Sequence, residues 1–142
     1  MTIKTLYEAQ VRASGGRSGR VRSSDGVLDL ELAVPRELGG PGGAKANPEQ
    51  LFAAGYAACF QSALLNVAQR RGRKLPPTQV EATVGIGPQG DAFALTVKLV
   101  ATIPGVPREE ALELLQEAHR VCPYSNAVRG NIAVGIELAE ST

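Results

Sequence analysis

The stretch that decides the fold is residues 47–72, NPEQLFAAGYAACFQSALLNVAQRRG. Asn47 is a good helix cap, Pro48 suits the first turn because its missing N–H is not needed there, and Gln50 can hydrogen-bond back toward the cap. Gly72 marks the predicted end of the helix. The middle of the stretch is apolar on all sides, as expected of a helix buried at the centre of a domain.

Alternating apolar and polar residues predict strands on both sides of this helix. They cover residues 5–13, 27–33, 80–86, 93–99 and 132–138. The first strands, with the turn signal at 23–26, predict a three-stranded antiparallel sheet, and residues 88–91 predict a hairpin turn. Residues 107–121 predict a second helix, which Pro123 ends near Cys122. We therefore expect one α+β domain over residues 1–142, with antiparallel sheets packed around a long buried central helix.

Composition and charge narrow the functional classes. The 15 basic and 14 acidic residues leave a net charge of only +1, which argues against nucleic acid as a partner. No apolar run approaches the ~18 residues that cross a bilayer, so we expect no membrane partner. The N-terminus MTIKTLYEAQ lacks the apolar core of a secretion signal, and the cytoplasm is the expected compartment.

Two weaker signals point away from bound cofactors. Residues 85–90 match the G-x-G-x-x-G pattern, but a strand follows them rather than the helix that a dinucleotide site needs. The single histidine, His119, and two cysteines fall short of the four ligands of a structural zinc site. We therefore expect no bound metal, and we interpret His119 as a polar or packing residue of the second helix.

The two cysteines, Cys59 and Cys122, carry the remaining chemistry. By composition alone, Cys59 in an apolar helix would be a small buried hydrophobic residue. The 63 residues between the two cysteines do not indicate whether they touch. A structural disulfide is disfavoured, because the cytoplasm keeps thiols reduced.

The sequence around these cysteines resembles a known family. Residues 47–60 and 121–131, the second reading VCPYSNAVRGN, are similar to the two signature segments of the organic hydroperoxide resistance proteins of the Ohr/OsmC superfamily. Residues 15–20 and 23–26 also look like this family, so the resemblance covers nearly the whole chain. The form CPYSNA at residues 122–127 favours the Ohr branch over the OsmC branch.

The resemblance implies a fold, a reaction and roles for four residues. The fold is OsmC-like, in an intertwined homodimer. The reaction is thiol-dependent reduction of organic hydroperoxides to alcohols, which protects against oxidative stress. Cys59 is the implied peroxidatic cysteine, Cys122 the resolving cysteine, and Arg17 with Glu49 the pair that activates Cys59. The implied reductant is a lipoyl-type dithiol on a lipoylated protein, a co-substrate rather than a bound cofactor.

These residue types suit that chemistry. A thiol with a pKa of about 8.5 is only a few per cent ionised at neutral pH, although the thiolate is the attacking species. A fixed cation such as Arg17 lowers that pKa, and Glu49 can orient it. The ten residues from Glu49 to Cys59 span ~15 Å of helix. Arg17 can therefore contact both Glu49 and Cys59 of one chain only if the helix breaks near Gly55. Otherwise a second chain must complete the site.

Apolar residues near Cys59 suggest selectivity for organic peroxides. Leu51, Phe52, Tyr56 and Phe60 could line a substrate pocket, although packing of the buried helix explains each of them equally well. Two other functions remain open: a peroxide-sensing redox switch, and an apolar-ligand binding module with inert cysteines.

Overall fold

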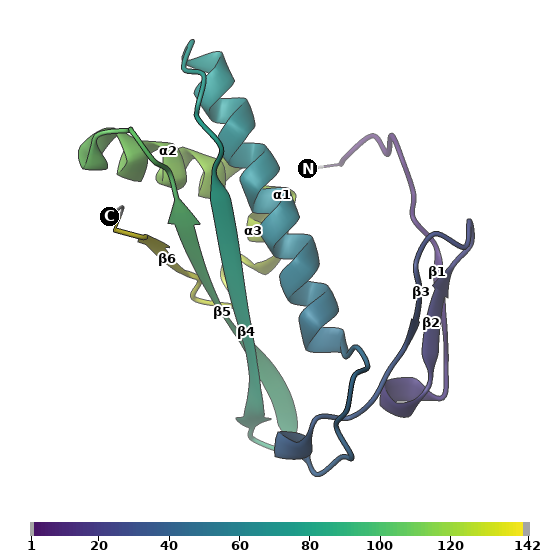
Figure 1. Cartoon of the computed structure of the whole chain (residues 1–142). Coiled ribbons are helices and arrows are strands. Elements are labelled where there is room, and N and C mark those ends of the chain that lie inside the picture. The colour runs from purple at the N-terminus through teal and green to yellow at the C-terminus, as the bar shows by residue number, and fades with distance from the viewer. Residues whose placement is uncertain (1, 141–142) are drawn as a thin grey trace. The chain divides into compact units, whose positions relative to one another are not determined.

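The computed structural model describes residues 2–140. The chain forms two compact units, Met1–Leu51 and Phe52–Thr142, whose elements are drawn in Figure 1. The long helix α1, Pro48–Arg70, carries the boundary between them. The single domain expected over residues 1–142 stays a prediction.

The first unit contains the predicted three-stranded antiparallel sheet, in the order β1-β2-β3. Its strands are β1 (Val11–Ser14), β2 (Arg20–Ser23) and β3 (Asp29–Glu31). The short 3-10 helix η1 (Gly16–Ser18) joins β1 to β2, and a second, η2 (Arg36–Leu38), lies in the loop before α1. Ser14 pairs with Arg20 across the sheet, so β1 and β2 hold the ends of η1 together.

The strand predicted over residues 5–13 is wrong in its extent, because β1 begins only at Val11. Ile3, Leu6 and Tyr7 are 81%, 90% and 79% exposed. A strand needs a neighbour for its backbone hydrogen bonds, and no strand is assigned over residues 2–10. An alternating sequence therefore indicates that a segment can form a strand, but it does not provide the neighbouring strand that pairing requires.

Helix α1 begins and ends where the sequence predicts. The Gln50 backbone N–H donates to Asn47 Oδ1 over 2.8 Å, which confirms the cap, and the Gly72 N–H closes the last turn on the Gln69 carbonyl. By length and composition alone α1 could cross a membrane, contrary to the sequence expectation. Core helices of water-soluble proteins meet the same criterion.

Burial of α1 is restricted to one face. The buried side chains recur at helical spacing and are Tyr56, Phe60, Ala63, Leu64, Val67 and Ala68. Leu65, on another face, is 45% exposed. The prediction of burial on all sides is therefore wrong for the single chain.

The second unit contains a sheet in the order β4-β5-β6. Strands β4 (Gln79–Gln89) and β5 (Ala92–Thr102) form the predicted hairpin, and Gly85 pairs with Thr96 inside it. The G-x-G-x-x-G match is thus part of a hairpin, as expected. Strand β6 (Gly135–Leu138) runs parallel to β5, which corrects the prediction of purely antiparallel sheets. The helices between β5 and β6 supply the crossover that a parallel pair needs.

Two helices follow β5, namely α2 (Arg108–Val121) and α3 (Pro123–Val128). The structure confirms α2 as predicted, whereas α3 was missed, because Pro123 ends one helix and also suits the first turn of the next. Figure 1 shows α1 running alongside the β4–β5 hairpin. The core of this unit joins α1, α2 and β5, including Leu64, Leu99 and Leu114, all fully buried.

Candidate active site

Arg17 and Glu49 form a two-pronged ion pair in the first unit. Arg17 Nη1 donates to Glu49 Oε2 over 2.9 Å, and Nη2 donates to Oε1 over 2.7 Å. The Glu49 side chain is 11% exposed and that of Arg17 is 39% exposed. The hydrogen bond to Arg17 lowers the pKa of Glu49, and the same bond raises the pKa of Arg17. Both groups are therefore charged at neutral pH.

The turn around η1 sets the position of Arg17. Gly19 lies so close to Ser14 that a Cβ at Gly19 would collide with the Ser14 carbonyl. This close approach lets the chain fold back between β1 and β2 with Arg17 at the turn. Glu49 meets it from the first turn of α1.

Cys59 and Cys122 lie side by side in the second unit, from α1 and from the junction of α2 and α3. Their sulfurs are 3.7 Å apart, with Cys122 Sγ donating to Cys59 Sγ, and both are free thiols. A disulfide bond is about 2.05 Å long, so closing it requires a movement of about 1.7 Å. Cys59 is partly exposed, whereas Cys122 is buried.

The surroundings of Cys59 within the second unit do not activate its thiol. Burial raises the pKa of Cys59, and the neighbouring Cys122 thiol raises it further, against a lowering by the Tyr124 backbone N–H. A reactive thiolate therefore needs a positive charge in addition to these contacts.

An aromatic group lies next to the cysteines. The ring of Tyr124 lies 6.2 Å from the Phe52 ring and 5.6 Å from the Tyr56 ring. A Cβ at Gly55 would lie 2.9 Å from Tyr124 Cζ, so the absence of a side chain at Gly55 lets α3 approach α1. Tyr124 lies in the signature segment that contains Cys122, but no local sequence pattern identifies it as a site residue.

A buried polar network lies in the same unit. The hydroxyl groups of Tyr56 and Ser125 are 2.6 Å apart, and His119 Nδ1 lies 2.8 Å from Ser125 Oγ. Tyr56 and Ser125 have no exposed surface. His119 lies on the second helix, α2, as predicted, whereas no local sequence pattern identifies Ser125 as its partner.

The structure thus forms two pairs from the four predicted catalytic residues. Arg17 pairs with Glu49 in the first unit, and Cys59 pairs with Cys122 in the second. Tyr56 and Phe60 have no exposed surface, which fits the core-packing alternative, so their contact with substrate stays a prediction. Phe52 is only partly buried.

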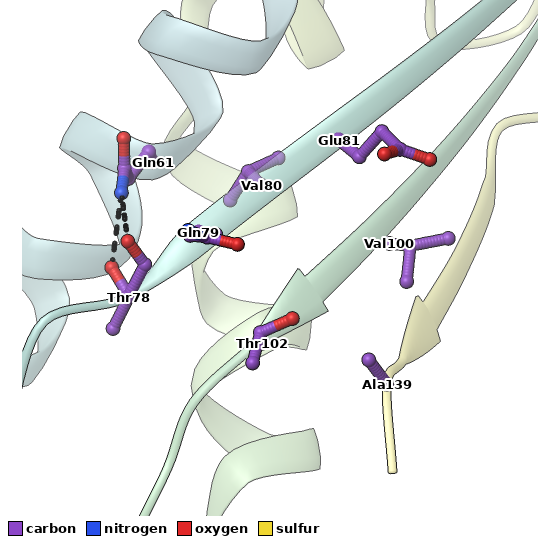
Figure 2. Close-up of a pocket in the computed structure, with 8 residues that line it drawn as sticks. All are labelled: Gln61, Thr78, Gln79, Val80, Glu81, Val100, Thr102 and Ala139. Carbon is purple, nitrogen blue, oxygen red and sulfur yellow. Dashed lines mark hydrogen bonds between the residues drawn. The ribbon is translucent and has the colours of Figure 1, made fainter. Parts of the chain in front are cut away.

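Figure 2 shows a pocket at the end of the second unit's sheet. Neither cysteine lines this pocket. Gln61 of α1 points toward the start of β4 there and donates to the Thr78 carbonyl over 2.9 Å. The lining residues are Gln61, Thr78, Gln79, Val80, Glu81, Val100, Thr102 and Ala139. Within residues 2–140, no three His, Cys, Asp or Glu side chains gather as a metal site.

This fold and site define a class of protein: an α+β protein with two neighbouring cysteines, one of them on the long helix α1. A family model described as OsmC-like protein matches residues 40–137. The organic hydroperoxide resistance protein of Xanthomonas axonopodis pv. citri (strain 306) is 52% identical over 137 residues, 96% of either chain.

Solved structures agree with these sequence matches. The crystal structure of an organic hydroperoxide resistance protein from Elizabethkingia anophelis, with crystallant-derived thiocyanate bound, gives a TM-score of 0.93 at 51% identity, covering 98% of this chain and 100% of that one. The organic hydroperoxide resistance protein OhrB of Bacillus subtilis gives 0.87 at 42% identity, covering 95% and 100%. The chain belongs to the OsmC-like family, in its organic hydroperoxide resistance branch.

Proposed function

We propose that this chain is a thiol-dependent peroxidase that reduces organic hydroperoxides to alcohols and protects the cell against oxidative stress. The observation that carries the proposal is the 3.7 Å separation of the Cys59 and Cys122 sulfurs. The names of its relatives, organic hydroperoxide resistance proteins, support the substrate class. Because Cys59 is partly exposed and Cys122 is buried, a peroxide reaches Cys59 first. We therefore assign Cys59 as the peroxidatic and Cys122 as the resolving cysteine.

The reaction has three steps. The Cys59 thiolate attacks the distal oxygen of the hydroperoxide, the O–O bond breaks, the alkoxide takes up a proton and leaves as the alcohol, and Cys59 becomes a sulfenic acid. Cys122 Sγ then attacks the Cys59 sulfur, so that water leaves and a disulfide forms. A dithiol finally supplies two electrons and two protons, which restores both thiols and oxidises the dithiol. We assign this role to a lipoyl-type dithiol of a lipoylated protein.

Arg17 supplies the positive charge in this proposal. Burial raises the pKa of Cys59, so a nearby guanidinium is needed to hold the thiolate and then the departing alkoxide. Glu49 positions Arg17 through their two hydrogen bonds. Helix α1 runs unbroken through Gly55, and the ~15 Å rise from Glu49 to Cys59 favours a site that a second chain completes.

A homodimer fits the exposed apolar surface of the single chain. Leu65 on α1 is 45% exposed, and Leu6 before β1 is 90% exposed. Contact with a second chain would remove such exposed apolar side chains from water, which supports the proposed homodimer. We further propose that the protein acts in the cytoplasm, where thiols are kept reduced.

The substrate preference follows from the apolar surroundings of Cys59. Tyr124 contacts Cys59 through its backbone N–H, and its ring lies edge to face with Phe52, with ring centroids 6.2 Å apart. These two rings would present apolar surface to an alkyl or fatty-acid chain. Hydrogen peroxide has no such chain and gains nothing from these contacts. We therefore propose selectivity for organic over hydrogen peroxide.

The test is steady-state peroxide consumption by the reduced protein, supplied with dihydrolipoamide and either cumene hydroperoxide or hydrogen peroxide. We expect rapid multiple turnover that favours the organic peroxide, no turnover in Cys59→Ser, and over-oxidation of Cys59 in Cys122→Ser. Arg17→Gln should slow the first step at pH 7 by tenfold or more, as expected for a thiol pKa raised by at least about one unit. A single stoichiometric oxidation would indicate a redox switch, and no reaction would indicate inert cysteines.

A further inference from the structure

The polar network behind the cysteine pair joins three helices at one hydroxyl group. Ser125 of α3 contacts Tyr56 of α1 over 2.6 Å and His119 of α2 over 2.8 Å. Ser125 and Tyr56 have no exposed surface. A buried hydroxyl group that loses its partner costs free energy, so the three side chains constrain one another.

One arrangement of hydrogens satisfies every member of this network. Tyr56 O–H donates to Ser125 Oγ, Ser125 O–H donates to His119 Nδ1, and His119 carries its proton on Nε2. The reverse arrangement leaves the buried Tyr56 hydroxyl hydrogen without an acceptor among these partners. Burial, followed by the charge of Arg129, lowers the pKa of His119, which agrees with a neutral ring. His119 Nδ1 is therefore the acceptor at the end of the chain of hydrogen bonds.

The network lies one helical turn from the resolving cysteine. Ser125 follows Cys122 by three residues, and the Asn126 N–H donates to the Cys122 carbonyl over 2.9 Å. Cys122 thus belongs to the rigid start of α3, while Tyr56 precedes Cys59 by three residues on α1. The Tyr56–Ser125 bond therefore fixes the distance between the two segments that carry the sulfurs.

We propose that Tyr56, Ser125 and His119 are positioning residues for closure of the Cys59–Cys122 disulfide. This inference rests on the proposed function, in which Cys122 attacks oxidised Cys59. The sulfurs must approach by about 1.7 Å, and the network holds α3 against α1 while the two cysteine side chains adjust. Ser125 and His119 have no role in the proposed reaction of Cys59 with peroxide, so the first step should not depend on them.

The test separates the first step from the second. Reduced protein receives one equivalent of cumene hydroperoxide without reductant, and peroxide loss, dimedone trapping of the sulfenic acid and disulfide content are followed together. In Ser125→Ala we expect an unchanged rate of peroxide loss, disulfide closure slower by about tenfold, as for the loss of one buried hydrogen bond, and more dimedone adduct. Tyr56→Phe, which keeps the ring and loses only the hydroxyl group, should slow disulfide closure by a similar factor.

His119 provides the readout that a merely structural role would not give. In His119→Asn the amide Oδ1 can take the place of Nδ1 as acceptor, so this variant should close the disulfide at nearly the wild-type rate. His119→Leu removes the acceptor and should behave like Ser125→Ala. Ser62→Ala, at an exposed serine of α1, is the matched control and should change nothing. Thermal unfolding of each variant identifies any that do not fold.

A second oxidant keeps this inference distinct from the peroxidase itself. Diamide couples two neighbouring thiols without peroxide chemistry, so it measures closure even if the wild-type protein does not consume the hydroperoxide. Slower closure in both Ser125→Ala and Tyr56→Phe with diamide would support the positioning role in either case. Closure at the wild-type rate in these folded variants, with either oxidant, would overturn it. Wild-type closure with diamide but no peroxide loss would reject the proposed peroxidase alone.

Discussion

At the scale of single residues, Glu49 depends on Arg17 for its charge state. Two hydrogen bonds from the guanidinium hold the carboxylate, and the Glu49 side chain is only 11% exposed. The bond to Arg17 outweighs burial and lowers the pKa of Glu49 below its usual 4.5. A group whose pKa is lowered by folding stabilises the folded state in its charged form.

Glu49→Gln should therefore change the pH dependence of stability. The contribution of the wild-type carboxylate is fully present above pH 4.5 and is lost as the pH falls through the lower folded pKa. We expect the wild-type free energy of unfolding to exceed that of the variant at pH 7, and this difference to shrink under acid. Urea unfolding at a series of pH values measures both. Glu37→Gln, at an exposed carboxylate of η2, is the control, and parallel pH curves for Glu49→Gln and wild type would contradict the prediction.

At the scale of elements, the contact between α1 and α3 depends on Gly55. A helix interior disfavours glycine by about 1 kcal/mol relative to alanine. Here a Cβ would lie 2.9 Å from Tyr124 Cζ, which is too close for carbon atoms in contact. The lower helix propensity of glycine is thus offset by the approach of α3, which carries Tyr124 and follows Cys122 directly.

A double-mutant cycle at Gly55 and Tyr124 tests this contact. In a Tyr124→Ala background, Gly55→Ala should stabilise the protein by up to about 1 kcal/mol, because only the helix propensity remains. In the wild-type background the same change should stabilise less or destabilise, since Tyr124 must move. Chemical denaturation of the four proteins gives the coupling energy, which should exceed about 0.5 kcal/mol. Additive effects would show that Tyr124 does not constrain position 55.

Some helices and strands can be predicted from local sequence signals alone, and others cannot. The caps of α1, the β4–β5 hairpin and the buried face of α2 follow from residues close together in the sequence, such as Asn47 and Gln50. Helix α3 does not follow from such local residues, because Pro123 can end one helix and begin another. The parallel direction of β6 is likewise decided by the helical crossover and not by the residues of the strand.

At the scale of the whole molecule, the apolar surface of the single chain is incompletely covered. Ile3, Leu6 and Tyr7 are exposed before β1, and Leu65 is exposed on α1. The apolar residues 51–60 are the reason why the sequence predicts burial of α1 on all sides. A second chain that covered the exposed face of α1 would reconcile this prediction with the structure.

We therefore expect the protein to sediment as a dimer, at about twice 14.9 kDa. Leu65→Lys places a charge in the proposed interface and should shift the equilibrium toward monomer, with a parallel loss of peroxidase activity. Glu81→Lys, at an exposed position on strand β4, is the control for the charge. A wild-type monomer that keeps full activity at nanomolar concentration would refute the two-chain site. Sedimentation and activity measured at the same concentrations decide between these outcomes.

The sequence by itself determined the long capped helix, the hairpin, the two cysteines as the candidate reactive groups and the family. These depend on local patterns of capping, alternation and motif, which a single stretch of chain contains. Tertiary structure alone decided that Cys122 lies 3.7 Å from Cys59 across 63 residues, and that Arg17 reaches Glu49 across 32. It also brought Tyr56, His119 and Ser125 together. The physical reason is that these contacts join separate elements, and packing between elements sets their distances.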